Sequence, residues 1–226
     1  MDSILPFISC TVSFVFAYFV FRRYFARRGL HLLLWGIGMI FYAIGGLCEA
    51  ATIVAGWHAL IFRLWYLFGA ILVAAWLGQG TVYLLASRRL ANILMIILGL
   101  ASLFAVVQVF NARLDPSLNT GSELSGLVIV SPGVRVLTPF FNIYGTLTLV
   151  GGAIWSAVTF WRKHILLHRA IGNVFIAVGA ILPAFGGTFS SFGISGGLYL
   201  SELLGSVLMF IGFLRSTTPM QADKKS

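Results

Sequence analysis

The chain has 226 residues, of which 59% are apolar and only 9% are charged, and its mean hydropathy is +0.98. A soluble domain of this length cannot bury so much apolar surface, whereas a lipid bilayer accommodates it. The composition therefore excludes an ordinary soluble protein and indicates a membrane protein. A net charge of +9 would suggest a nucleic-acid partner in a soluble chain, but the positions of the basic residues favour another explanation.

Seven apolar runs are each long enough to cross the roughly 30 Å hydrocarbon core of a bilayer. The first run is followed by its arginines and lacks a small-residue cleavage site, so we expect it to be retained rather than removed as a signal peptide. We predict a single all-α domain at 1–215 with a short polar tail at 216–226. Its seven transmembrane helices are predicted at 4–21, 31–56, 59–86, 90–111, 137–161, 170–192 and 195–214.

The basic residues gather on one side of this predicted bundle. Twelve of the 15 Lys and Arg residues follow the first, third, fifth and seventh helices, whereas the opposite connections hold only Arg113 and Arg135. By the positive-inside rule, the N-terminus lies outside and the C-terminus lies in the cytoplasm. We therefore expect a multi-pass protein of the bacterial plasma (inner) membrane. The lipid bilayer is its partner, and no nucleic acid is expected to bind.

The longest connection, 112–136, is predicted on the outer side and is rich in Pro, Ser, Gly and Asn. Its segment LSGLVIV could form a short strand or lie on the membrane surface. Loops of this length are often binding elements, although a simple crossover explains it equally well.

An internal similarity links two of the predicted helices. Residues 37–50 align without gaps to 171–184, and six of the 14 aligned positions are identical. Both segments cross the membrane in the same direction, which suggests a 3+1+3 parallel repeat of a kind known among transporters. A chance match between two apolar segments is the other explanation.

Three charged side chains, Glu49, Arg63 and Glu202, lie inside predicted helices. Each costs about 2.5–3.5 kcal/mol near the middle of a bilayer, so each calls for a partner or a function. At 1.5 Å of rise per residue, all three lie in the outer half of the membrane. Small and polar residues share their helical faces, which predicts that the three charges point into the bundle.

Two carboxylates and one guanidinium do not balance, so one carboxylate is expected to take up a proton or to bind a cation. We therefore predict an outward-facing polar pocket for a small or lipidic molecule. The alternative is that Arg63 only pairs with Glu49 and joins two helices. The predicted ligand-binding residues are Tyr42, Glu49, Arg63, Tyr66, Asn142, Tyr199 and Glu202, and the hydroxyl groups of Thr188, Ser190 and Ser191 lie at the same level.

The second and third helices resemble the membrane sensor module at the N-terminus of some bacterial histidine kinases. The residues that carry this resemblance are Trp35, Tyr42, Glu49, Arg63, Tyr66 and Gly69. The resemblance implies a sensor-like protein. Because no kinase domain follows, we expect it to act through a protein partner or a neighbouring copy of the chain.

Two other functional classes fit the sequence. A small-solute or ion-coupled transporter is favoured by the possible repeat and by Pro183, which we expect to kink or break its helix. A structural or accessory subunit of a membrane complex is the third class. An enzyme is the least favoured, because the sequence holds no recognisable nucleophile–base pair, nucleotide-binding loop or metal-ligand cluster, and it identifies no cofactor. Trp65 is expected in an interfacial aromatic belt, and Cys10 and Cys48 are expected as buried thiols.

Overall fold

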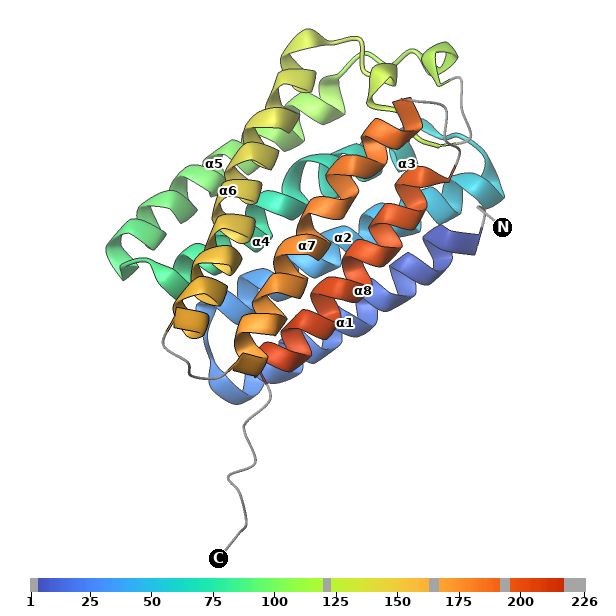
Figure 1. Ribbon diagram of the computed structural model, residues 1–226. Coiled ribbons are helices and arrows are strands. Elements are labelled where there is room, and N and C mark those ends of the chain that lie inside the picture. The colour runs from blue at the N-terminus through green and yellow to red at the C-terminus, as the bar shows by residue number, and fades with distance from the viewer. Residues whose placement is uncertain (1–3, 120–122, 163–166, 192–195, 218–226) are drawn as a thin grey trace, which may run out of the picture.

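The structure is a computed structural model that describes residues 4–119, 123–162, 167–191 and 196–217, without the side chains at 167 and 187–191. Within these residues the chain is helical and has no strand (Figure 1). Seven helical spans in the described ranges are long and apolar enough to cross a membrane. The predicted all-α fold is confirmed, and the seven apolar spans indicate a multi-pass membrane protein.

Six of the spans are single helices: α1 (Leu5–Arg27), α2 (Leu30–Ala55), α5 (Arg88–Asn111), α6 (Pro132–Arg162), α7 (Leu167–Ser191) and α8 (Gly197–Thr217). The third span is composite and consists of α3 (Ala59–Leu64), the π-helical segment η2 (Trp65–Leu72) and α4 (Val73–Leu85). Two short 3₁₀ turns, η3 (Pro116–Leu118) and η4 (Gly126–Val128), lie between α5 and α6.

Two predicted helix boundaries differ from the structure by more than three residues. The helix α1 continues to Arg27 instead of ending at position 21. Its added turns are held by Arg23, which donates a hydrogen bond to the Thr217 carbonyl of α8 at 2.7 Å. The helix α6 begins at Pro132 rather than at position 137, because proline suits the first turn of a helix. Pro139, expected at the helix start, lies inside α6, and the long connection covers 112–131 rather than 112–136.

The two ends of the bundle differ in charge. The α1–α2 and α4–α5 connections, the end of α6, the start of α7 and the end of α8 lie together at one end, which we call the basic end (Figure 1). The other end carries the 112–131 connection, and we call it the loop end. Of the 12 cations predicted on one side, Lys163, Lys224 and Lys225 lie outside the described residues. The other nine flank the basic end: Arg22, Arg23, Arg27, Arg28, Arg88, Arg89, Arg162, Arg169 and Arg215.

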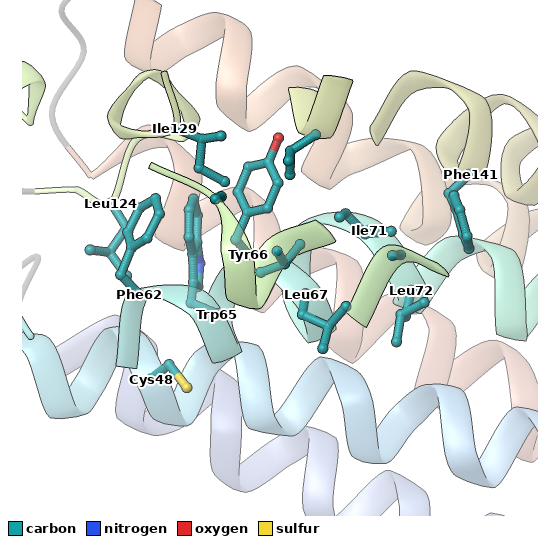
Figure 2. Close-up of a cluster of buried hydrophobic side chains, with 14 of the residues drawn as sticks. Cys48, Phe62, Trp65, Tyr66, Leu67, Ile71, Leu72, Leu124, Ile129 and Phe141 are labelled. Carbon is teal, nitrogen blue, oxygen red and sulfur yellow. The ribbon is translucent and has the colours of Figure 1, made fainter. Parts of the chain in front are cut away.

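The 112–131 connection covers the loop end of the bundle. Residues 124–130 form no strand but contain η4 and a single bridge between Leu114 and Ile129. Figure 2 shows Leu124 and Ile129 beside the aromatic side chains of η2 and α3, in the same buried cluster. Since Val128 and Ile129 are fully buried, this segment packs on the bundle.

The helices α7 and α8 pack closely against each other through glycines spaced seven residues apart. A Cβ atom built on Gly179 would lie 2.7 Å from the Gly205 carbonyl oxygen, and one on Gly212 would lie 2.5 Å from the Gly172 carbonyl oxygen. Such pairs let helix backbones approach closely in a membrane. The Pro183 ring removes the amide that would bond the Gly179 carbonyl, yet α7 remains helical to Ser191, so the expected break is absent.

Candidate functional site

A cavity of about 300 Å³ lies among six elements of the bundle, between its middle and the loop end. Its walls come from α2, η2, α4, α6, α7 and α8. Most of the lining is small or apolar, so the few polar groups determine what the cavity can bind. The polar side chains that line it are Tyr42, Glu49, Trp65, Thr138, Asn142, Thr146 and Glu202.

Glu49 on α2 is 1% exposed and is held by the π-helical segment beside it. The indole of Trp65 donates a hydrogen bond to Glu49 Oε1 at 2.8 Å. The segment reaches α2 closely because a glycine of each helix meets the other: a Cβ on Gly45 would lie 3.0 Å from the Gly69 Cα. Glu49 Oε2 has no hydrogen-bond donor among the described residues.

Glu202 on α8 provides the second carboxyl group of the cavity. Its carboxyl group lies beside that of Glu49, where the two can share a hydrogen bond when one of them is protonated. The hydroxyl group of Tyr42 donates to the Glu202 backbone carbonyl at 2.8 Å, which fixes this turn of α8 against α2. The two glutamates that the sequence predicted at one level therefore meet in one cavity.

The α6 wall is formed by polar side chains. Asn142 donates to the Ala70 carbonyl of η2 at 3.0 Å and lines the cavity. Thr138 also lines the cavity, and its hydroxyl group lies 2.8 Å from that of Tyr66. Tyr66 itself packs behind this wall in the buried cluster of Figure 2 and does not line the cavity.

Arg63 does not occupy the predicted position. Its guanidinium group donates hydrogen bonds to the carbonyl groups of Val109 and Ala112, the second at 3.0 Å. These carbonyls end α5, where a cation is favoured by the helix dipole. Arg63 neither lines the cavity nor pairs with Glu49, so both interpretations made from the sequence fail for this residue. The rise per residue predicted the depth of Arg63 in the membrane, but it could not show that Arg63 bonds the end of α5 and not Glu49.

Tyr199 is buried beside the cavity but is not part of its lining. It interacts electrostatically with Glu49, Glu202 and a third carboxylate, Glu123 of the 112–131 connection. Glu123 is 7% exposed, and neither of its oxygens has a hydrogen-bond partner among the described residues. Sequence reasoning missed Glu123, although its place beside the apolar segment 124–130 was a signal. The side chains of Thr188, Ser190 and Ser191 lie outside the described residues.

Two further expectations are settled by burial. Trp65 is 8% exposed and belongs to the core, so its assignment to an interfacial belt was wrong. Cys10 and Cys48 are free and buried, as expected.

A smaller cavity of about 50 Å³ lies between the first cavity and the basic end of the bundle. Its walls include Trp35, Thr81 and Asn173 in the halves of α2, α4 and α7 that face that end. Three side chains line both cavities: Leu77, Leu149 and Met209. We call these three buried apolar residues the septum, because they lie where the cavities meet.

Comparisons with known proteins identify no similar protein, so the cavity and its lining residues are the evidence for function. A scan against protein-family models finds no match, and searches of curated proteins and of solved structures find none either. The resemblance to histidine-kinase sensor modules therefore stays a prediction.

Proposed function

We propose that the protein is a polytopic membrane protein that binds a small or lipidic molecule in the 300 Å³ cavity. The observation that carries this proposal is Glu49, a buried carboxylate that lines the cavity and has one oxygen without a donor. A buried polar group without a partner is costly, and intramembrane ionisable residues usually mark a functional site. A ligand that completes the bonding of the carboxyl pair removes this cost.

Binding alone gives the cell no output, so we propose that the protein acts through a partner. The resemblance of α2 and the third span to sensor modules supports this role. A protein partner or a second copy of the chain would detect the occupied cavity.

The ligand is expected to be lost when the cavity is filled. Thr146 lines the cavity and is exposed at its edge, whereas the next residue, Leu147, is 70% exposed and points away from it. We expect native mass spectrometry of the gently solubilised protein to show a bound species that Leu147→Trp retains and Thr146→Trp loses. A wild-type protein with no bound species, or equal retention by both variants, would contradict ligand binding in this cavity.

A transporter is the second candidate, and the septum is the observation that favours it. A cavity on each side of a thin apolar barrier is the arrangement expected for a pathway that opens alternately to the two sides. The polar groups of the smaller cavity, among them Thr81, Ser156 and Asn173, could receive a solute there.

We propose that the loop end faces outward and that the basic end lies in the cytoplasm, with the protein in the bacterial inner membrane. The charge difference between the two ends supports this orientation. It is tested in a protein whose two native cysteines are replaced by alanine. A membrane-impermeant maleimide should label Ser117→Cys in intact cells and Arg89→Cys only after permeabilisation. The reverse pattern would invert the proposed orientation.

A further inference from the structure

The carboxyl pair of the cavity has no counter-charge among the described side chains that line it. Glu49 and Glu202 are the only charged side chains among the described residues that line the cavity. The nearest candidate cation by sequence, Arg63, is held by carbonyl groups at the end of α5. Taking a carboxylate out of water costs several kcal/mol unless a partner compensates it. The cavity thus holds negative charge that a ligand can neutralise.

A third acidic residue near the cavity adds to its negative charge. Glu123 interacts electrostatically with both Glu49 and Glu202, so three of the six acidic residues of the chain act on one place. An anionic ligand would meet the two carboxyl groups of the lining, with Glu123 near them, and no basic side chain of the described lining. Like charges in a poorly solvated site repel strongly, so the site selects against anions.

The size and lining of the cavity distinguish an organic cation from a metal ion. No group of three His, Cys, Asp or Glu residues in the described part of the chain is placed to hold a metal. A volume of about 300 Å³ accommodates a drug-sized molecule, and most of the wall is apolar. Trp65 and Tyr42 line the cavity beside the carboxyl groups, and aromatic rings attract ammonium groups.

We infer that the cavity binds an organic ammonium ion, whose positive group lies at Glu49 and Glu202 and whose apolar body lies along the apolar lining of α4 and α7. This inference rests on the proposed function and adds the chemical class of the ligand. The ammonium group can belong to a free amine or to the headgroup of a lipid such as phosphatidylethanolamine. Because Thr146 and Ala184 of the lining are exposed on α6 and α7, either source could enter from the side of the bundle.

The chemical class of the ligand is tested with three probes of similar shape and different charge: phenethylamine, phenylacetate and 2-phenylethanol. Each is titrated by calorimetry into the protein in nanodiscs of phosphatidylglycerol, a lipid without an ammonium group. In parallel, the protein is extracted from vesicles of phosphatidylethanolamine and phosphatidylglycerol, and its bound lipids are identified by native mass spectrometry. We expect either phenethylamine to bind in preference to the other probes or phosphatidylethanolamine to be retained in preference to phosphatidylglycerol. The first result identifies a free amine as the source and the second a lipid headgroup.

Charge removal provides the matched control. Glu202→Gln is expected to weaken binding of the cationic ligand by about 10- to 100-fold, the range for loss of one charged hydrogen bond. Asp115→Asn removes the same charge from a residue of the 112–131 connection that does not line the cavity, and it should leave binding unchanged. Melting temperatures of both variants show that each is folded, and Glu49→Gln repeats the test from the other carboxyl group.

The outcomes distinguish the cationic class of the ligand from ligand binding itself. If phenylacetate or 2-phenylethanol binds as well as phenethylamine, or if Glu202→Gln has no effect on a bound amine or lipid, the cationic class is wrong and ligand binding stands. If no probe binds and no lipid is retained, the proposed binding function is itself wrong.

Discussion

Gly179→Leu is expected to prevent α7 and α8 from packing, and the protein should then fail to fold or be recovered only as aggregate. A Cβ atom at this position would lie 2.7 Å from the Gly205 carbonyl oxygen and 2.8 Å from the Met209 amide nitrogen. Both atoms belong to the backbone and cannot rotate away. The milder Gly179→Ala should cost about 1–3 kcal/mol, the usual range for overpacking, and so lower the melting temperature by roughly 5 °C.

Gly151→Leu and Gly151→Ala are the matched controls for these variants. Gly151 also lies inside a helix, but a Cβ built on it meets nothing within 4 Å. These variants should fold and should be as stable as the wild type or slightly more stable, since alanine and leucine favour a helix over glycine. Melting curves in detergent and size-exclusion profiles measure the difference. Equal stability of the Gly179 and Gly151 variants would show that α7 and α8 are farther apart than described.

Much of the fold could be predicted because membrane helices follow from the length of apolar runs alone. The errors occurred where helix ends depend on tertiary contacts. Arg22 and Arg23 read as a loop after the first span, yet α1 continues through them because long arginine side chains keep their charges in water while their stems stay in the helix. The π-helical segment was not predictable either. Its geometry accompanies contacts of Trp65 and Gly69 with α2, which no local pattern encodes.

The candidate site was predicted in part. Their depth in the membrane and the helical faces on which they lie placed Glu49 and Glu202 at one level of the bundle. The structure brings their carboxyl groups together. The same arithmetic also placed Arg63 at this level, because depth and face do not say which helix is the neighbour. Arg63 instead donates hydrogen bonds to carbonyl groups at the end of α5, so it does not pair with the carboxyl groups of the cavity. The charge imbalance noted in the sequence is therefore larger in the structure.

The α7–α8 contact links this site to the rest of the bundle. Glu202 lies three residues before Gly205, the residue that meets Gly179, and Pro183 of α7 lines the cavity. Tyr42 bonds the Glu202 carbonyl from α2. A ligand at the carboxyl pair thus contacts the turn of α8 that two other helices hold in place, so occupancy can change how these helices pack.

The septum is expected to be the barrier between the two sides of the membrane if the protein is a transporter. Leu149→Ala combined with Met209→Ala removes two of its three side chains and joins the two cavities. We expect the passive flux of phenethylamine, or of protons under an imposed potential, to rise roughly tenfold or more in proteoliposomes, because narrow apolar constrictions block polar solutes by excluding water. Fluorescent pH indicators and radiolabelled amine efflux measure the two fluxes.

Leu147→Ala controls for this result, because it removes the same side chain from the same helix at a position that is 70% exposed and does not line either cavity. Each truncation of a buried side chain costs about 2–5 kcal/mol, so the melting temperature of the double variant is measured first, and Leu149→Ala alone serves if it unfolds. A folded septum variant that remains as impermeable as Leu147→Ala would show that the cavities do not form a pathway. The protein would then bind its ligand without transporting it, because the septum lies where the two cavities meet.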